Sequence, residues 1–350
     1  MLRFPLPAAF PAGRPCPGGC LPRPWPMAVT LLTRSDLQRL LPMSAVIDRL
    51  RIAFEAYAAG ALNLPPRQRL DVSGGAVFIM PCAGLGGRLG IKTVSVFEGN
   101  PARGMPRLLG TYALHDAETG ALLALLDGAY LTAVRTAGTS ALAATSLARP
   151  ESSRVGVFGS GVQARFHLEA LRARFSIAEA MVVGRTPAKA AAFATTTERD
   201  LGMRVRAAAG PDELLAWADI VVTATTAGTP LFAGHLLRPG QCVLAVGAFA
   251  PTTRELDTRA IQRARLFVDT REGALAEAGE VLIPLAEGAI EKAHILGDLG
   301  DLVAGRCRGR QGAEEITIFK SVGSALEDLA TAILALEGAG GARLGQRANL

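Results

Sequence analysis

Apolar positions in the first 150 residues change from a helical spacing to short extended runs. Thr33 or Ser35 can cap a first helix, and residues 43–59 carry apolar side chains along one helical face. An Ala- and Thr-rich helix is expected over 131–147. Between these helices, short apolar runs bounded by Gly or Pro predict strands of a sheet at 76–80, 90–97, 111–115 and 121–126.

From about residue 150 the pattern becomes a regular alternation of strands and helices. One helix is expected after residue 164, up to about residue 174. Another is expected over 187–201, where Pro187 suits a first helical position. Compact apolar runs predict strands at 153–158, 180–183, 220–224, 242–246 and 266–269. Such alternation is typical of an α/β fold with a doubly wound parallel sheet.

A glycine-rich turn over 159–164 joins the first of these strands to its helix. Gly159 permits the sharp turn, Gly161 lets a pyrophosphate approach the backbone, and Ala164 lets helix and strand pack closely. The helix N-terminus adds free N–H groups and partial positive charge. This context favours a dinucleotide site over a glycine-rich loop of another α/β fold. The predicted cofactor-binding residues in the turn and at later strand ends are Gly159, Ser160, Gly161, Val162, Gln163, Ala164, Thr223, Ala224, Thr225, Val246 and Val322.

The end of the second strand discriminates between the two nicotinamide cofactors. An acidic residue there would bind the ribose hydroxyls of NAD, whereas this chain has Gly184-Arg185-Thr186. The Arg185 guanidinium can pair with a 2′-phosphate, and the Thr186 hydroxyl can add a hydrogen bond. We therefore predict that NADPH is preferred and that NADH is possible. The alternative is that Arg185 is a solvated charge at a strand end.

Composition limits the classes of partner. The 350 residues are 49% hydrophobic, which suits two domains or one large one. The net charge of +6 is spread along the chain, and aromatic residues make up only 5%, so an anionic small ligand is favoured over nucleic acid. No apolar run reaches the length of a membrane span. We expect neither a nucleic-acid partner nor a membrane segment.

Cysteine and proline usage adds information about the compartment and the N-terminus. Five cysteines, an odd number, favour a reducing, cytoplasmic setting over a disulfide framework. Cys16 and Cys20 have no further metal ligands nearby, and we predict no metal site. Residues 1–26 contain eight prolines and no acidic residue, which predicts a disordered extension. It is either a segment upstream of a natural start at Met27 or a genuine flexible tail.

Several short motifs together resemble the ornithine cyclodeaminase and mu-crystallin family. The resemblance covers residues 31–336 and implies a homodimer, with a Rossmann domain inserted in an α+β substrate-binding and dimerisation domain. The expected domains are 149–316 for the Rossmann part, and 27–148 with 317–350 for the other. Apolar residues from Val322 to Leu336 fall on one face of an expected last helix. The motifs are Pro66-Arg67, Met80-Pro81, Gly90-Ile91-Lys92, Gly99-Asn100-Pro101, Asp127-Gly128, residues 131–137, the glycine turn and residues 318–323.

The resemblance also implies a binding site for the substrate carboxylate. The family places this group among two arginines and a lysine, and the matching residues are Arg67, Lys92 and Arg135, with Arg69 as a nearby competitor of Arg67. Several cationic donors suit a carboxylate removed from water. Lys92 lies in a predicted strand among apolar neighbours, which is unusual for a surface lysine. Lys92, or a water that it holds, is the candidate proton donor.

One position departs from the deaminating members of the family. Where they carry an aspartate this chain has Phe249, which has no acid–base chemistry but offers an apolar wall to a ring. The stretch resembles the branch that reduces cyclic ketimines. We therefore expect NADPH-dependent reduction of Δ1-pyrroline-2-carboxylate to L-proline and of Δ1-piperideine-2-carboxylate to L-pipecolate. Three alternatives remain open: a cyclodeaminase or alanine-dehydrogenase-like oxidoreductase, an opine-like synthase, and a non-catalytic binding protein.

Overall fold

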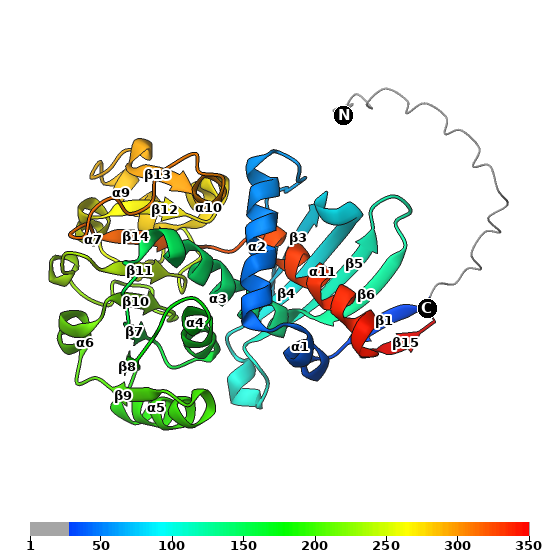
Figure 1. Ribbon diagram of the computed structural model, residues 1–350, viewed down its shortest axis with the longest axis horizontal. Coiled ribbons are helices and arrows are strands. Elements are labelled where there is room, and N and C mark those ends of the chain that lie inside the picture. Colours follow the sequence, from blue (N-terminus) through cyan, green and yellow to red (C-terminus); the bar gives the residue numbers. More distant parts are fainter. Residues whose placement is uncertain (1–27, 350) are drawn as a thin grey trace.

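The computed structural model describes residues 28–349 and contains two β-sheets joined by helices (Figure 1). In that view the parallel sheet lies on the left and the mostly antiparallel sheet on the right. The extension expected over 1–26, with Cys16 and Cys20, lies outside the described residues. The α/β fold class is confirmed.

The first sheet has seven strands in the order β15-β1-β6-β5-β4-β3-β2, in which β1 runs parallel to β6 and the other pairs are antiparallel. All four strands predicted in this region are confirmed as β3 to β6. The unpredicted β1 and β15 are short, and β2 is exposed along its length, so none carries a clear apolar period. The bounds are β1 (Val29–Leu32), β2 (Gln68–Val72), β3 (Gly75–Ala83), β4 (Arg88–Phe97), β5 (Leu108–Asp116), β6 (Leu122–Asp127) and β15 (Gln346–Ala348).

The second sheet has eight parallel strands in the order β13-β12-β14-β11-β10-β7-β8-β9. The five strands predicted after residue 150 are confirmed as β7, β8, β10, β11 and β12, and β9, β13 and β14 were not predicted. The bounds are β7 (Arg154–Phe158), β8 (Glu179–Val183), β9 (Arg204–Ala207), β10 (Ile220–Thr223), β11 (Cys242–Ala245), β12 (Arg265–Val268), β13 (Ile295–Asp298) and β14 (Thr317–Lys320).

Helices begin where the sequence supplies caps. Thr33 accepts a hydrogen bond from the Asp36 amide at the start of α1, and Asp127 accepts from the first amides of α3. Every expected helix is present. The bounds are α1 (Arg34–Leu40), α2 (Met43–Ala58), α3 (Gly128–Leu147), α4 (Val162–Arg172), α5 (Pro187–Leu201), α6 (Pro211–Trp217), α7 (Thr258–Arg263), α8 (Arg271–Glu277), α9 (Gly279–Ala286), α10 (Leu299–Val303) and α11 (Ala325–Ala342), with 3-10 turns at Leu85–Gly87, Asn100–Arg103, Gly234–Leu236 and Lys292–His294.

The boundary expected at residue 317 needs a correction. Strand β14 pairs with β11 and β12 in the middle of the parallel sheet, so the chain leaves that sheet only after Lys320. Its sequence, Thr-Ile-Phe-Lys, has a polar residue at each end and so does not stand out as a compact apolar run. Val322 also lies ahead of α11, which begins at Ala325 after the cap Ser324. The expected last helix therefore starts one turn later.

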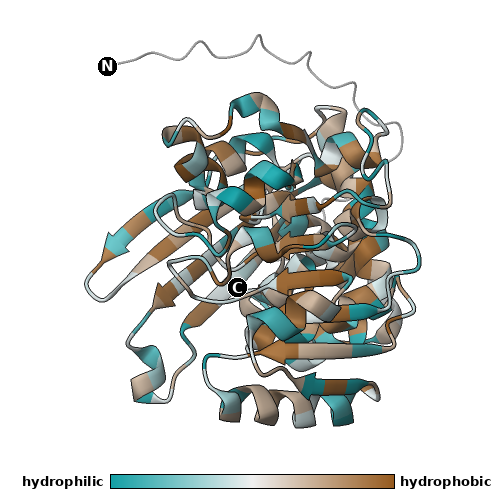
Figure 2. Ribbon diagram, turned by 90° about the vertical axis from the view of Figure 1, so that its left-hand side faces the viewer, coloured by the Kyte–Doolittle hydropathy of each residue, from teal (hydrophilic) through white to brown (hydrophobic). Residues whose placement is uncertain are grey.

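Helix α3 connects the two halves of the molecule. It packs against β4, β5 and β6 of the first sheet and against β11, β14 and α4 of the second half. Most of its length is buried, which explains its many small Ala and Thr side chains. In Figure 2 the strands in the middle of the molecule are mostly brown, and the outer helices mix brown with teal. Arg135 in α3 therefore lies in the interior, where a charge needs partners.

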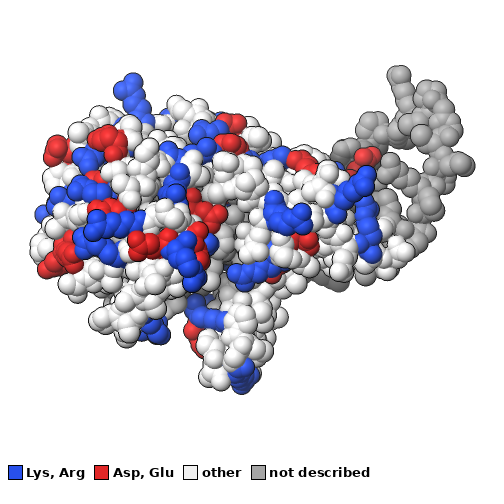
Figure 3. Space-filling model, turned by 60° about the horizontal axis from the view of Figure 1, so that its bottom comes forward, with Lys and Arg blue, Asp and Glu red and all other residues white. Residues whose placement is uncertain are grey.

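Surface charge is mixed. On the face shown in Figure 3, Lys and Arg stand interspersed with Asp and Glu. Many charged side chains of the described residues form ion pairs, such as Arg206 with Glu213 and Arg165 with Glu169. Across residues 28–349, every helix is too short or too polar to cross a membrane.

Candidate active site

The glycine turn has the geometry that its sequence predicts. Gly159 has a φ of +112°, and a Cβ there would lie 2.5 Å from the Ala224 carbonyl oxygen, so only glycine fits. A Cβ on Gly161 would meet no atom within 4 Å, because this position faces open space. Within residues 28–349 no side chain caps the first turn of α4, whose N-cap residue is Gly161. The amides of that turn can therefore bind a phosphate.

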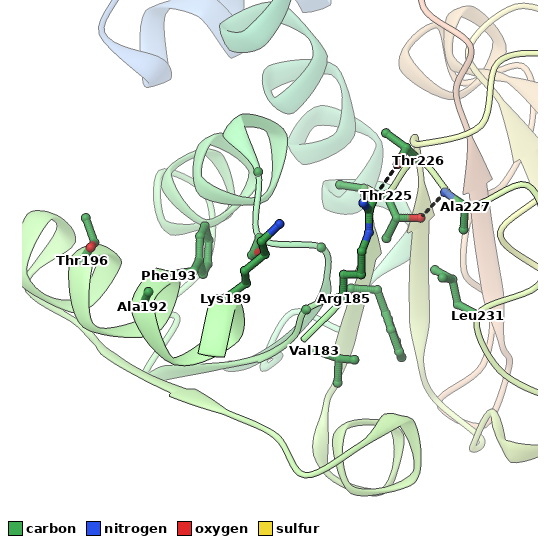
Figure 4. Close-up of a pocket in the computed structure, with 16 residues that line it drawn as sticks. Val183, Arg185, Lys189, Ala192, Phe193, Thr196, Thr225, Thr226, Ala227 and Leu231 are labelled. Atoms are coloured by element: carbon green, nitrogen blue, oxygen red, sulfur yellow. Dashed lines mark hydrogen bonds between the residues drawn. The ribbon is translucent and has the colours of Figure 1, made fainter. Parts of the chain in front are cut away.

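A cavity of about 840 Å³ opens beside this turn (Figure 4). Arg185, at the end of β8, extends into it and donates a hydrogen bond of 3.1 Å to the Thr226 hydroxyl. Lys189 of α5 extends into the same space. Among the described residues that line the cavity, none is acidic. The uncapped helix end, the open side of Gly161 and the two cations together fit a nicotinamide dinucleotide with its phosphates.

The predicted cofactor residues divide between the cavity wall and its support. Gly159, Ser160, Gly161, Arg185, Ala224 and Thr225 line the cavity. Thr223 does not, because it is fully buried and its hydroxyl donates to Glu255. Thr186 caps α5 by accepting from the Lys189 amide, and Ala164 is buried against the sheet. The remaining predicted residues, Val162, Gln163, Val246 and Val322, are also outside the lining of this cavity.

Lys92 and Arg135 meet in the interior of the other half of the molecule. Lys92 Nζ lies 2.6 Å from Asp328 Oδ2, and Arg135 Nε lies 3.1 Å from Asp328 Oδ1. Arg135 also donates to Glu327 Oε2 at 2.8 Å. Lys92 is 1% exposed and Arg135 5%. The side chains of Lys92, Arg135, Glu327 and Asp328, from β4, α3 and α11, are called the cation cluster below.

Arg67 joins this cluster through a backbone segment. It donates to the carbonyl oxygens of Val322 and Gly323 at 2.7 and 3.0 Å, and it pairs with Glu277 at 2.6 Å. A Cβ on Gly323 would lie 2.6 Å from Arg135 Nη1, so Gly323 contacts both arginines. The competitor Arg69 has an exposed side chain paired with Asp71. The structure therefore brings Arg67, rather than Arg69, to Arg135.

Burial changes the titration of the cluster. Desolvation, followed by the neighbouring Arg135 charge, lowers the pKa of Lys92 to about 8, although Asp328 opposes this shift. Burial also raises the pKa of Glu327, against the effect of Arg135. A lysine with such a pKa can hold or release a proton near neutral pH.

Phe249 belongs to the loop that follows β11. This residue is 36% exposed, and its ring stands edge-on to Phe78 of β3, with 6.4 Å between the ring centres. Phe78 lies on the same face of the first sheet as Lys92, because it pairs with Val94 and side chains alternate along a strand. The two phenylalanines thus form an apolar contact between the halves of the molecule, on the face that carries Lys92.

Sequence reasoning missed the acidic partners of the cations. Glu327 and Asp328 are buried in the first turn of α11, and Glu327 also accepts from the Ser324 amide. Ser324 and Glu327 have the spacing of a capping box. This helix-capping role explains Glu327 without its pairing with Arg135, so the sequence gives no reason to look for that pairing. The available signal was physical, since two buried cations require anionic partners somewhere in the chain. Residues 28–349 contain no cluster of metal-ligating side chains.

The parallel sheet, glycine turn and uncapped helix end define a dinucleotide-binding enzyme, and comparisons with known proteins agree. The model of the ornithine cyclodeaminase/mu-crystallin family matches residues 27–341. Δ1-Pyrroline-2-carboxylate reductase of Bacillus cereus is 36% identical over 86% of this chain and 94% of its own. The chain belongs to the ornithine cyclodeaminase/mu-crystallin family.

Two solved structures extend the comparison to three dimensions. Δ1-Pyrroline-2-carboxylate reductase of Thermococcus litoralis, in complex with NADH and L-proline, has a TM-score of 0.88 and 37% identity, covering 91% of this chain and 99% of its own. An archaeal alanine dehydrogenase dimer with bound NAD has a TM-score of 0.87 and 32% identity, covering 92% and 99%. The predicted family and fold are confirmed, and the protein is an NAD(P)-dependent amino-acid oxidoreductase of this family.

Proposed function

We propose that this protein reduces the C=N bond of small cyclic ketimines that carry one carboxylate. The expected products are L-proline from Δ1-pyrroline-2-carboxylate and L-pipecolate from Δ1-piperideine-2-carboxylate. The observation that carries this proposal is the combination of a buried cation cluster with an apolar wall of Phe78 and Phe249. A cyclic substrate with one carboxylate needs cations for its carboxylate and an apolar surface for its ring. The likeness to two Δ1-pyrroline-2-carboxylate reductases supports the same substrate class.

In this proposal the cations bind the substrate carboxylate. Arg135 and Lys92 have fixed positions because Asp328 holds both, so little side-chain freedom is lost on binding. Arg67 is held by the carbonyl oxygens of Val322 and Gly323. Glu327 holds Arg135 from the other side through their ion pair, and burial raises the pKa of Glu327 against the effect of Arg135.

The reaction needs one hydride and one proton. When bound, the reduced nicotinamide supplies the hydride to the carbon of the C=N bond. Lys92, or a water that it holds, gives a proton to the ring nitrogen. Its pKa of about 8 makes the ammonium both populated and acidic enough near neutral pH. An iminium carbon is already electrophilic, so positioning supplies much of the remaining catalysis.

NADPH is the proposed cofactor. Arg185 and Lys189 are the cationic side chains that line the dinucleotide cavity, at the place where a 2′-phosphate would bind. A guanidinium suits two-pronged binding of this phosphate. Related structures hold NADH or NAD, so NADH is proposed as a weaker alternative.

A homodimer is proposed as the assembly. The face of the first sheet opposite Lys92 carries half-buried apolar residues, including Val77, Ile79 and Ile91, and Leu109 is 44% exposed. A second copy covering this face would bury apolar surface that is otherwise in contact with water. The related archaeal alanine dehydrogenase is a dimer.

A panel of substrates tests the proposed function. NADPH oxidation is measured with each cyclic ketimine and with pyruvate plus ammonia or methylamine, and NAD reduction with L-alanine. Ammonia release is measured with L-ornithine. We expect kcat/KM to be highest for a ring and no measurable ammonia from L-ornithine. Robust turnover of pyruvate with ammonia, without ring reduction, would instead assign the protein to the alanine dehydrogenase branch.

A further inference from the structure

Three fully buried charged side chains lie beneath the loop that carries Phe249. They are Glu255 at the end of this loop, Glu280 in α9 and Lys320 at the end of β14. Lys320 Nζ donates to the Ala248 carbonyl oxygen at 2.6 Å and pairs with Glu280 Oε2 at 3.0 Å. Lys320 thus binds the residue immediately before Phe249.

The two glutamates hold both ends of the same loop. Glu280 Oε1 accepts from the Glu255 amide at 2.9 Å. The Glu255 carboxylate accepts from the Gly247 amide at 2.8 Å, and from the hydroxyls of Thr223 and Thr225 at 2.7 Å. Residues 247 and 255 are therefore tied to each other and to the carboxyl end of β10.

Packing leaves the loop little freedom to take another path. A Cβ on Gly247 would lie 2.4 Å from Glu255 Oε1 and from the Thr225 carbonyl oxygen. A Cβ on Gly279 would lie 2.0 Å from the Thr253 carbonyl oxygen. Atoms this close determine the backbone on both sides of Phe249.

We propose that Lys320, together with Glu280, is a positioning residue that fixes the Phe249 loop and so determines how tightly the cyclic substrate is held. The inference rests on the proposed function for the identity of the substrate. Lys320 touches the Ala248 carbonyl and not the reacting atoms, so its effect passes through Phe249 and its contact with Phe78. It also gives a role to the Phe319-Lys320-Ser321 motif, to which the sequence alone assigns none.

The charge of Lys320 is needed where it lies. Two carboxylates share its surroundings, and burial raises the pKa of Glu255 while the Lys320 charge opposes that shift. A neutral side chain at position 320 would leave the Ala248 oxygen without this donor and Glu280 without its cation. We expect the loop to loosen first, because this ion pair binds both the Ala248 carbonyl and the Glu255 amide.

The first test needs no ligand and does not depend on the proposed function. Hydrogen exchange of the amides in 246–255 is compared in the full chain and in Lys320→Met. The matched control is Gln241→Leu, which removes a buried side chain at the opposite end of β11 that donates to the carbonyls of Leu215 and Ala218. We expect exchange about tenfold faster in Lys320→Met only. Equal acceleration in both variants, or none, would overturn the proposal.

The second test separates positioning from general stability. Lys320→Met should raise KM for Δ1-pyrroline-2-carboxylate about tenfold, with the Kd for NADPH and kcat near wild type. Phe249→Ala should raise KM similarly. The double variant should have the KM of Phe249→Ala alone, because both changes remove the same contact. Additive effects on KM would contradict action through Phe249.

A second variant covers the case in which Lys320→Met does not fold. Lys320→Met with Glu280→Gln removes both charges and keeps an acceptor for the Glu255 amide. We expect this double variant to fold, with the same rapid exchange over 246–255. A folded double variant with wild-type exchange would overturn the proposal. Failure of wild-type protein to reduce any ring would count against the proposed function alone, since the exchange result stands by itself.

Discussion

The dinucleotide cavity and the cation cluster both offer positive charge to an anionic ligand, but the cavity is open and the cluster is closed. The cavity contains the glycine turn, and the uncapped helix end and the cations Arg185 and Lys189 border its open space. The cluster is closed, and Lys92 and Arg135 are already paired with Glu327 and Asp328. A ligand entering the cavity mainly replaces water, whereas a carboxylate entering the cluster joins a balanced set of charges. Loss of one charge should therefore cost more in the cluster than in the cavity.

The largest effect is expected from Lys92→Met, which keeps the length of the side chain and removes its charge. It takes away a carboxylate partner and the candidate proton donor, so ring reduction should fall by about 10²–10⁴-fold. The Kd for NADPH should stay near wild type, because the dinucleotide cavity belongs to the other half of the molecule. Lys189→Met is the matched control, and it should weaken NADPH binding without abolishing turnover. Activity of Lys92→Met within a few-fold of wild type would show that Lys92 is structural.

The next largest effect tests the cavity. Arg185→Asp should weaken NADPH binding about ten- to a hundredfold, because one charge-assisted phosphate contact contributes about 1.5–3 kcal/mol. NADH binding should change much less. Arg204→Asp, at the exposed first position of strand β9 and outside the cavity lining, is the control and should leave both Kd values unchanged. Equal loss for NADPH and NADH would remove the basis for the phosphate preference.

Phe249→Asp tests the apolar wall between the two regions. Its carboxylate would stand against Phe78 and the bound ring, where it loses hydrogen bonds to water. Leaving a polar group unsatisfied in this way costs about 1–3 kcal/mol, so we expect ring reduction to fall about twentyfold. Measuring kcat/KM for both rings, with Phe249→Leu as an apolar control, checks this. The aspartate need not create a cyclodeaminase, since ornithine also requires a pocket for its side chain. Unchanged ring reduction in Phe249→Asp would place the ring elsewhere.

The smallest expected effect is a pH dependence that belongs to the cluster alone. With the pKa of Lys92 near 8, kcat/KM for ring reduction should fall as the pH rises, by about tenfold at pH 9. NADPH binding should not follow this profile. In Lys92→Arg the residual activity should lack this falling limb, because guanidinium stays charged. The same limb in Lys92→Arg would assign the titration to another group.

The contribution of Lys92 to stability should increase with pH over the range in which activity falls. An unfolded lysine titrates near 10.5, so between about pH 8 and 10.5 the unfolded chain binds more protons at residue 92 than the folded chain does. From this group alone, the free energy of unfolding therefore rises with pH. Thermal unfolding measured at the same pH values separates the titration of Lys92 from any loss of folded protein.

Local features were predictable from the sequence, and partnerships between distant residues were not. The turn at Gly159 and the cap at Thr33 depend on neighbours within a few residues, and both have the expected structure. Asp328 lies 236 positions from Lys92 in the chain, so no local pattern reports their contact. The position of Thr223 outside the cavity lining was unpredictable for a similar reason. The hydroxyl of Thr223 donates to Glu255, which lies 32 positions later in the chain, in the loop after the next strand. No local sequence pattern identifies Glu255 as this partner.

Strands without a compact apolar run, such as β9 and β14, were the other source of error. Strand β14 has four residues and lies in the middle of the parallel sheet between β11 and β12. Its position depends on pairing with strands more than fifty residues earlier in the chain. The domain boundary therefore falls later than the sequence pattern indicated. Lys320 reaches the Phe249 loop because of this placement.

The most direct test of the central claim is the stoichiometry of a single reaction. Purified protein is incubated with Δ1-pyrroline-2-carboxylate and NADPH, and L-proline is quantified by chiral chromatography against the NADPH consumed. The proposed function predicts equimolar L-proline, with the reaction lost in Lys92→Met. No proline from the ring, together with NAD-dependent release of ammonia from L-alanine or L-ornithine, would contradict it.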